Sequence, residues 1–349
     1  MHSEASEDEA DTPDSLLSPD LNKDRFQTAI RRLRTHFDIY AGTCTVPLPA
    51  PGLIVTPEIR TQCERYLQIA DITAVFNHLY SAALTYPPIL SSTPFHSAMS
   101  WADAFAALPT QFQFSTNPAC LLEALLEDRA LLTAFLFASF LPGRFYGGIG
   151  RYPGQRQFIR EWLKSRQGRM LRCLDAACGT GEDTYGLALL LSKEGFSPEE
   201  ILVEGWTLEP LEVWAATRRR FPNDRRRETG LREATAALYQ RGYGSRISFR
   251  CVDLTEIPPG EADGGGQFDL ILCNGLLGGP IIHQKEQLGQ AVVSLAQLLA
   301  PGGILLAADN FHGGWKQKCP QAELRALFEE NGMNVVETGE GFGGLKPDQ

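Results

Sequence analysis

The feature that most constrains this chain is the alternation of short apolar runs and amphipathic stretches between residues 171 and 343. Strands are expected at 171–175, 201–209, 247–253, 268–277 and 304–310, with one or two more in 334–343. Helices are expected between them at 184–193, 210–221, 286–300 and 321–332. Strands that alternate with helices, and that are apolar along most of their length, predict a doubly wound, mainly parallel, Rossmann-like sheet.

The chain before this region has a helical pattern without strands. In DRFQTAIRRLRTHF the apolar residues recur at helical spacing. Thr56 is a suitable N-cap, and Pro57 a suitable first residue, for a second helix that extends to about Tyr80. A further helical stretch covers 118–143, whereas 86–118 is not assigned. The pattern predicts a disordered acidic tail at 1–24, an all-helical domain at 25–143 and an α/β domain at 144–349.

The composition, 43% hydrophobic and 21% charged over 349 residues, is that of a globular protein. A formal net charge of −10 argues against nucleic acid as the partner. The eight cysteines include no CxxC pair and no metal-ligand spacing, so we expect reduced thiols, no metal site and a cytoplasmic location. The N-terminus lacks the apolar core of a signal peptide. The most apolar stretch, ALLTAFLFASFL, is shorter than the ~20 residues of a membrane span, so no membrane insertion is expected.

The loop after the first expected strand raises the question of its ligand. Asp175 ends the strand, and Gly179 and Gly181 let the backbone pass close to a bound molecule. A dinucleotide-binding loop has a third glycine and leaves helix N–H groups open to a pyrophosphate. Here that glycine is missing, and Glu182 and Asp183 stand at the anion site. Carboxylates there suit a cationic or amine-bearing ligand, although helix capping explains Asp183 about as well.

Polar residues also follow the next strands. Glu209 ends the second, where an acid binds ribose hydroxyls, the alternative being a helix cap before Pro210. Asp253 ends the third, either as a turn residue or as the acceptor for an adenine amino group with Leu254 against the ring. Asn274 ends the fourth. Because ligands bind at the carboxyl ends of parallel strands, these residues predict a site for a phosphate-free adenosine with an amino-bearing or positive tail. S-adenosylmethionine (SAM) has this composition.

Three segments carry a resemblance to a known family. AACGTGEDTYGLA resembles the loop AxCSTGEEPYSLA of the chemotaxis-receptor glutamate methyltransferases, the CheR-type family of class I SAM-dependent methyltransferases. FDLILCNGLL is similar to that family's FDxIFCRNVL, and LAPGGILLAADN to its LKPGGxLFLGHSE. The resemblance covers about 145–310 and implies SAM as the cofactor, with Arg151 matched to the arginine of the family's FFRE segment as a candidate for the methionine carboxylate. The residues expected to bind the cofactor are Arg151, Asp175, Ala177, Gly179, Gly181, Glu182, Glu209, Asp253, Leu254 and Asn274.

The acceptor side departs from the family. Where the family reads RNVLIYF, this chain reads NGLLGGPI, without the arginine and the tyrosine. The resemblance therefore implies a methyltransferase whose acceptor is a protein carboxylate or a small molecule, and it assigns no catalytic residue. His312 and His283 are candidate bases for a hydroxyl or amine acceptor, with a surface or structural role as the alternative. Tyr146 and Tyr152 either cover the cofactor or pack between the domains.

Two other functions remain open at this point. The missing arginine and tyrosine are compatible with a non-catalytic SAM-binding or interaction module. An NAD-dependent oxidoreductase is disfavoured by Glu182 and by the missing third glycine. The one basic cluster, RRRFPNDRRRE at 218–228, is either a solvated helix end or a docking surface for an acidic partner.

Overall fold

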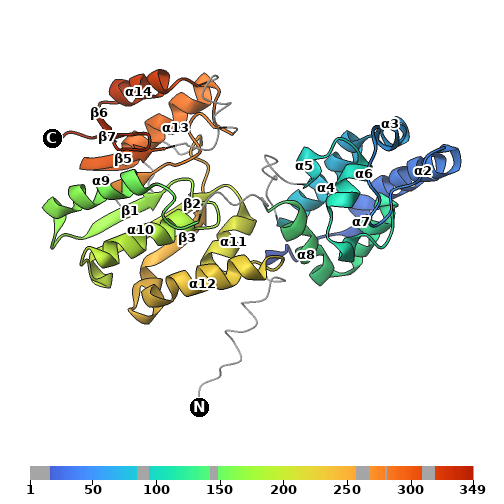
Figure 1. The fold of residues 1–349 in the computed structure, drawn as a ribbon, viewed down its shortest axis with the longest axis horizontal. Helices are drawn as coiled ribbons and strands as arrows, with labels where there is room; N and C mark the ends of the chain where they lie inside the picture. The colour runs from blue at the N-terminus through green and yellow to red at the C-terminus, as the bar shows by residue number, and fades with distance from the viewer. Residues whose placement is uncertain are drawn as a thin grey trace, which may run out of the picture. The chain divides into compact units, whose positions relative to one another are not determined.

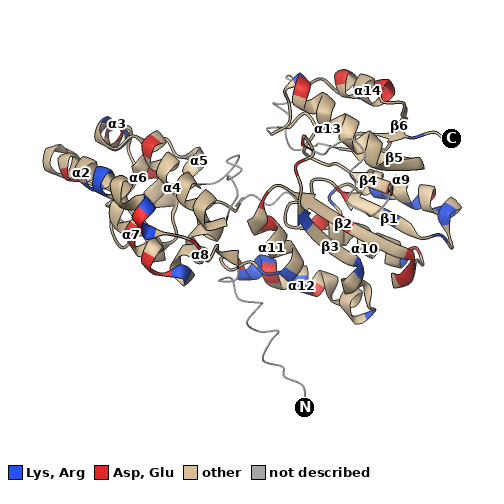
Figure 2. Cartoon of the chain, turned by 180° about the vertical axis from the view of Figure 1, so that it is seen from behind, with Lys and Arg blue, Asp and Glu red and all other residues tan. Residues whose placement is uncertain are grey.

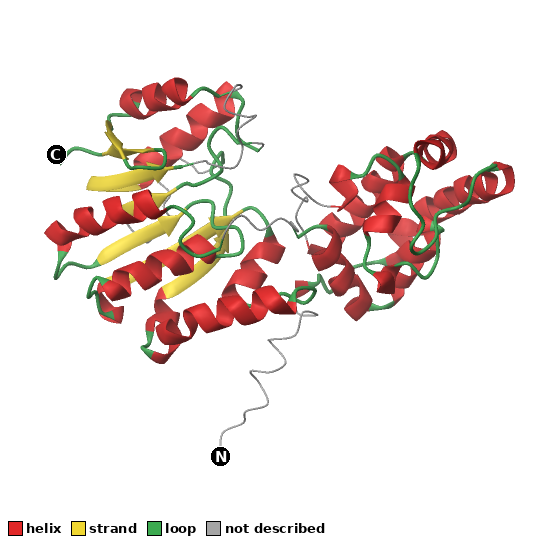
Figure 3. Ribbon diagram, viewed as in Figure 1, coloured by secondary structure: helices red, strands yellow, loops and turns green. Residues whose placement is uncertain are grey.

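The computed structural model describes residues 16–84, 94–141, 148–256, 267–279, 281–308 and 319–348. The chain divides into two compact units, one of Met1–Arg144 with Phe221–Asp224 and one of Phe145–Arg220 with Arg225–Gln349. In the described residues the first unit is helical and the second contains the sheet (Figure 1 and Figure 3). The predicted tail lies outside the described residues up to residue 15. Within its last part, Leu17 is buried, and its carbonyl oxygen accepts a hydrogen bond from Arg129 Nη2 at 3.2 Å.

The helical unit contains more and shorter helices than the sequence pattern predicts. The helix expected from Thr56 to Tyr80 is two helices, because Leu67 has a non-helical backbone (φ −125°, ψ 80°). The stretch expected over 118–143 breaks at Asp128, whose carboxylate accepts hydrogen bonds from the next helix's first amides. No described helix is long and apolar enough to span a bilayer. The elements are η2 (Lys23–Phe26), α2 (Gln27–Thr43), α3 (Pro57–Tyr66), α4 (Ile69–Leu84), α5 (Pro94–Ser97), α6 (Trp101–Ala107), η3 (Thr110–Phe112), α7 (Pro118–Glu127) and α8 (Arg129–Ser139).

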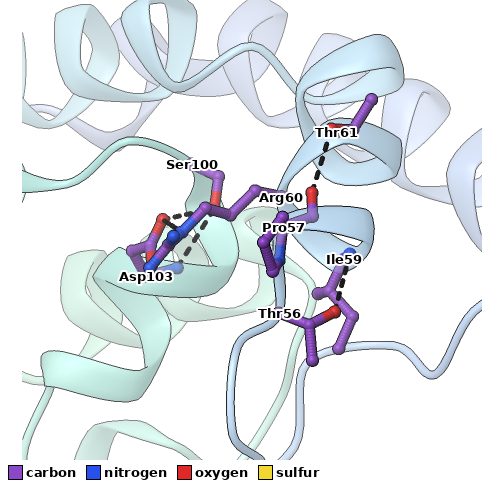
Figure 4. A network of polar contacts seen from close by, with 7 residues as sticks. All are labelled: Thr56, Pro57, Ile59, Arg60, Thr61, Ser100 and Asp103. Carbon is purple, nitrogen blue, oxygen red and sulfur yellow. Dashed lines mark hydrogen bonds and ion pairs between the residues drawn. The ribbon is translucent and has the colours of Figure 1, made fainter.

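Aromatic packing and capping bonds hold this unit together. Phe95 stacks on Phe140 with ring centroids 5.9 Å apart, and Phe135 contacts both rings. Figure 4 shows the polar link between α3 and α6, in which Asp103 accepts from Arg60 Nε at 2.9 and 3.0 Å. The Ser100 hydroxyl donates to Asp103 at 2.8 Å and caps α6. The Nε–H of Arg60 is shared between both carboxylate oxygens, and this charge-assisted contact anchors α6 to α3.

The second unit is built on one seven-stranded sheet of order β3-β2-β1-β4-β5-β7-β6. Strands β1 to β5 are parallel, and β7 runs antiparallel to both β5 and β6. This arrangement confirms the doubly wound, mainly parallel sheet that the sequence predicts. The strands are β1 (Leu171–Asp175), β2 (Ile201–Thr207), β3 (Ile247–Cys251), β4 (Phe268–Leu272), β5 (Leu299–Ala307), β6 (Asn334–Glu337) and β7 (Phe342–Leu345). The helices are α9 (Pro153–Leu163), η4 (Lys164–Arg166), α10 (Glu182–Lys193), η5 (Pro198–Glu200), α11 (Pro210–Arg218), α12 (Arg225–Gln240), η6 (Tyr243–Arg246), α13 (Lys285–Leu298) and α14 (Gln321–Glu330).

Helices cover both faces of the sheet. Ile271 of β4 belongs to the core cluster that contains Leu295 of α13, whereas its neighbour Leu272 lines a small cavity with Ile159 of α9 and Leu187 of α10. Since successive strand residues point to opposite faces, α13 lies on one face and α9 and α10 on the other. Strand β4 ends at Leu272, before the predicted end at 277, because the chain then turns through a glycine-containing loop.

Helix α12 was not expected, because its composition is mostly polar. Its buried residues Leu231, Thr235 and Leu238 nevertheless lie on one helical face. In Figure 2 the ribbon of α11 and α12 has both blue and red segments, which mark basic and acidic residues in both helices.

The start of α9 is held by the last hairpin of the sheet. Glu340, between β6 and β7, accepts hydrogen bonds from the amides of Gly154 at 2.9 Å and Gln155 at 2.7 Å. A Cβ at Gly154 would lie 2.8 Å from Glu340 Oε2 and 3.2 Å from the Gly339 Cα, so a larger residue would displace this carboxylate. A carboxylate at a helix N-terminus is favoured by the unbonded amides and the helix dipole, so Glu340 fixes where α9 begins.

Candidate functional site

The carboxyl ends of β1, β2, β3 and β4 meet at one edge of the sheet, because these strands are parallel neighbours. Asp175 closes β1 opposite Gly205 of β2, and Thr207 at the end of β2 pairs with Cys251 of β3. Each of the next three strand ends is followed two residues later by a predicted site residue, namely Glu209, Asp253 and Asn274. The topology therefore brings the predicted strand-end residues to one edge.

Two glycines shape the loop between β1 and α10. Gly179 (φ 49°) and Gly181 (φ 90°) are left-handed, and Gly181 is the N-cap of α10. A Cβ at Gly181 would lie 2.9 Å from Cε1 of Phe249, so packing as well as backbone conformation requires this glycine. A Cβ at Gly179 would approach Glu212 Oε1 at 3.8 Å and no other described atom within 4 Å. The loop therefore has room beside Gly179, and Ala177 just before it is half-buried.

Asp175 is a buried acid at the centre of this edge. Its side chain accepts a hydrogen bond from Thr184 Oγ1 at 2.8 Å, and the residue is 1% exposed. Burial, together with the charge of Asp183, raises the pKa of Asp175 to about 7. Because a nearby cation favours the ionised form, this carboxyl group is suited to a ligand that brings positive charge.

Arg151 and Asp183 form an ion pair at the start of α10. Nε and Nη2 of Arg151 approach Asp183 Oδ2 at 2.8 and 2.7 Å, and the side chains are 21% and 10% exposed. Burial raises the pKa of Asp183, and the charge of Arg151 opposes that rise. Arg151 also lies 5.1 Å from the ring centroid of Tyr152, which is buried. The pair provides a carboxylate and a guanidinium side by side, the two charges that an amino-acid zwitterion requires.

Asn274 is fixed from two sides. It exchanges hydrogen bonds with the amide of Gln155, at 2.9 Å and 3.0 Å, and its Oδ1 accepts from the backbone amide of Ala308 at 3.0 Å. Both amide side chains are buried. Asn274 therefore links β4 to α9 and to the end of β5, and any ligand role is added to this structural one.

Glu182 lies on the α12 side of the loop. Its Oε1 accepts from Arg227 Nε at 3.1 Å and Nη2 at 2.8 Å, and its Oε2 accepts from Thr180 Oγ1 at 2.7 Å. Thr180 Oγ1 also accepts a hydrogen bond from Arg227 Nη2. The Glu182 carboxylate is thus balanced within the protein, in contrast to the ligand-facing role that its position in the sequence predicts.

Glu209 and Glu212 begin α11. Glu209 is 2% exposed, and its Oε1 accepts from the Leu211 amide at 3.3 Å, so it caps the helix, the alternative left open by the sequence. Glu212 accepts a hydrogen bond from Thr207 Oγ1 at 2.6 Å. Burial raises the pKa of Glu212 to about 7, and the charge of Glu182 adds to the rise. These contacts concentrate carboxylates around the glycine loop.

Asp253 and Leu254 have separate structural roles. Asp253 Oδ1 accepts from the amide and the hydroxyl of Thr255, at 2.8 and 2.6 Å, so Asp253 is a turn residue. Leu254 is 4% exposed and belongs to the core cluster with Trp206. The contacts of both with an adenine remain predictions, as do the cofactor roles of the other predicted site residues.

Sequence reasoning missed three residues of this edge: Gln155, Glu212 and Arg227. Glu212 had a signal, since it follows the N-cap Glu209 at the spacing of a first-turn acid. Arg227 departs from both explanations offered for the basic cluster, because its side chain is only 14% exposed. Tyr146 and His312 lie outside the described residues, and His283 is half-buried.

The small cavity noted above lies under α9, not at the predicted adenosine site. Its lining includes Gln155, Asp183 and Asn274, but neither Glu209 nor Asp253. It therefore borders the Arg151–Asp183 pair. No group of three or more metal-ligating side chains occurs in the part of the chain that the structure describes.

Comparison with known proteins adds sequence evidence. No protein-family model matches the chain. The chain is 30% identical over 146 residues to the probable biofilm formation methyltransferase WspC of Pseudomonas putida, covering 39% of this chain and 33% of that protein. It is 28% identical over 202 residues to a chemotaxis protein methyltransferase of Listeria monocytogenes, covering 55% of this chain and 71% of that protein. The chain is a relative of these methyltransferases. The resemblance carried by the three motifs is therefore confirmed.

The extent of the matches differs between these relatives. The chain spans about a third of the length of the WspC proteins that it matches.

Among solved structures it is similar to the N-methyltransferase NodS of Bradyrhizobium japonicum in complex with S-adenosyl-L-homocysteine. That match has 17% identity and a TM-score of 0.37, and covers 64% of this chain and 94% of NodS.

Proposed function

We propose that this protein is a SAM-dependent methyltransferase of the CheR type, which transfers a methyl group to a protein carboxylate or to a small molecule. The observation that carries the proposal is the glycine loop with Asp175 and Glu209 at adjacent strand ends, in a chain related to methyltransferases. An acid at the end of β2 suits ribose hydroxyls. Carboxylates at the start of α10 suit an ammonium group and disfavour a pyrophosphate.

The charges of the residues at this edge suit those of SAM. The open space beside Gly179 admits a ligand close to the backbone. Glu209 would hold the ribose and Asp253 with Leu254 the adenine. The Arg151–Asp183 pair would hold the carboxylate and the ammonium of the methionine moiety. Glu209 follows β2, Asp253 and Leu254 follow β3, Asp183 lies in α10, and Arg151 precedes α9.

When bound, SAM supplies an electrophilic methyl group on a sulfonium. The protein's task is to orient an acceptor in line with that group and to exclude water. A carboxylate acceptor needs no base, whereas a hydroxyl or amine acceptor needs one. The Arg and Tyr of the family's acceptor loop are absent here, so receptor glutamate is not carried over as the substrate. The cytoplasmic location also stays a prediction.

The experiment is calorimetric titration of SAM and S-adenosylhomocysteine into wild type, Glu209→Ala and Glu256→Ala. Glu256 is exposed and also follows a strand end, so it is the matched control. We expect micromolar binding to wild type and to Glu256→Ala, and at least about a tenfold loss in Glu209→Ala, equal to about 1.4 kcal/mol. Absence of binding to folded wild type would remove the proposal.

A second assay separates the enzyme from a non-catalytic SAM-binding module. Methyl transfer from isotopically labelled SAM is followed with carboxylate-bearing peptides and with small hydroxyl or amine acceptors. Transfer to any acceptor supports the enzyme. Binding without transfer to either acceptor class supports the module.

A further inference from the structure

Arg227 connects a helix outside the nucleotide-binding motif to the glycine loop. It lies in the first turn of α12, between β2 and β3 in the chain. Its guanidinium reaches Glu182 through two nitrogens and Thr180 through one of them. Thr180 in turn donates to Glu182. The three side chains thus form a closed ring of hydrogen bonds, here called the loop clasp.

The loop clasp is largely withdrawn from water. The side chains of Arg227 and Glu182 are each 14% exposed, and Thr180 is 5% exposed. By contrast, Arg225 and Arg226 in the same turn of α12 are exposed. A charge-assisted contact at this depth is stronger than a surface ion pair, and loss of one partner leaves the other charge uncompensated.

The position of the clasp matters because of the residues on either side of Thr180. Gly179 and Gly181 both have positive φ angles, so the backbone around Thr180 has no side chain that restricts it. Besides the backbone hydrogen bond from the Gly181 amide to the Cys178 carbonyl at 2.8 Å, the side-chain contacts of Thr180 and Glu182 hold this part of the loop. Both contacts end on Arg227.

We propose that Arg227 is a positioning residue, which holds the Thr180–Glu182 segment in the conformation that binds the methionine moiety of the cofactor. This inference rests on the proposed function, since it concerns the same site. Arg227 acts through Thr180 and Glu182, and the cofactor's own charges are left to Asp183 and Arg151. In this proposal Glu182 holds the loop in position, and Asp183 binds the cofactor.

The first test needs no cofactor. Hydrogen–deuterium exchange of peptides covering 176–186 is compared between wild type, Arg227→Gln, Arg227→Lys and the matched control Arg226→Gln. We expect faster exchange of this segment in Arg227→Gln, an intermediate rate in Arg227→Lys, and the wild-type rate in Arg226→Gln. Lysine keeps the charge but not the forked geometry, so it restores only part of the clasp.

The second test is calorimetric binding of S-adenosylhomocysteine to the same variants. Arg227→Gln is expected to bind at least about tenfold more weakly, with partial recovery in Arg227→Lys. Combining Arg227→Gln with Glu182→Gln is expected to cost less than the sum of the single changes, because both break one ring. Thr180→Val, which keeps the side-chain shape, gives a smaller loss and replaces Arg227→Gln if that variant does not fold.

The outcomes separate the two proposals. If wild type binds and Arg227→Gln exchanges and binds as wild type does, the positioning role is wrong and the methyltransferase proposal stands. If Arg227→Gln exchanges faster only within α12 and binds normally, Arg227 is a helix anchor and the inference is overturned. If folded wild type does not bind, the proposed function fails, and the exchange data alone decide whether Arg227 orders the loop.

Discussion

Asp103 in the helical unit and Glu212 in the sheet unit occupy the same local position, three residues after an N-cap, but have different surroundings. Asp103 follows Ser100 and receives the Arg60 guanidinium on both carboxylate oxygens. Glu212 follows Glu209 and receives the hydroxyl of Thr207. Burial raises the pKa of Glu212 to about 7. The helical unit pairs this first-turn acid with an arginine, whereas in the sheet unit burial raises the pKa of the corresponding acid.

The largest difference in stability between the two units is expected from substitutions of glycine. A Cβ at Gly205 of β2 would lie 2.6 Å from Phe249 Cδ1 and 2.9 Å from Thr184 Oγ1, so Gly205→Ala should lower the free energy of unfolding by about 3 kcal/mol. Gly42 of α2 has nothing within 4 Å, so Gly42→Ala should raise it by about 0.5–1 kcal/mol. Urea unfolding, with hydrogen exchange to assign each transition to its unit, measures both. Equal changes in the free energy of unfolding for Gly205→Ala and Gly42→Ala would contradict the close packing at Gly205 and the open space at Gly42.

The second prediction concerns pH. The pKa of Glu212 is about 7 in the folded protein and about 4.3 when unfolded. The folded state therefore binds more protons between these values, and the sheet unit loses stability as pH rises through this window, by on the order of 2 kcal/mol. Glu212→Gln should flatten that dependence and stabilise the unit at pH 8.

The matched change in the other unit is Asp103→Asn. It should destabilise the helical unit at both pH 5.5 and pH 8, by about 1–2 kcal/mol, because the Arg60 contact loses its charge. Unfolding curves of Glu212→Gln and Asp103→Asn at the two pH values test both predictions. An unchanged pH dependence in Glu212→Gln would show that this carboxyl group ionises normally.

The smallest effect is expected at a surface ion pair. Lys23 and Glu127 lie 2.5 Å apart, with side chains 40% and 65% exposed. Lys23→Ala should change the free energy of unfolding by less than about 0.5 kcal/mol, since water screens exposed charges. If Lys23→Ala lowered the free energy of unfolding as much as Asp103→Asn, the difference in exposure between the Lys23–Glu127 and Arg60–Asp103 ion pairs would not explain their strengths.

The sheet was predictable because its strands are apolar and its turns contain glycine, both of which are local signals. Helix α12 was not, because its buried face holds few apolar residues and a threonine. The breaks at Leu67 and Asp128 were missed because a continuous apolar pattern does not report a single extended backbone position.

The strand-end acids were predictable as a set, since the carboxyl ends of parallel strands meet. The partner of each acid was not predictable. Glu182 and Asp183 are neighbours in the sequence, yet one pairs with Arg227 and the other with Arg151. Both arginines are distant in the chain, one before β1 and one after β2, so no local pattern assigns these pairs.

The bond between Glu340 and the start of α9 has a consequence for synthesis of the chain. The amides of Gly154 and Gln155 leave the ribosome long before their acceptor, which lies 186 and 185 residues further on. During that interval the first helix of the sheet unit has no carboxylate at its start, and β5 has no antiparallel neighbour. A nascent chain that stops before residue 340 therefore lacks the contact that fixes the start of α9.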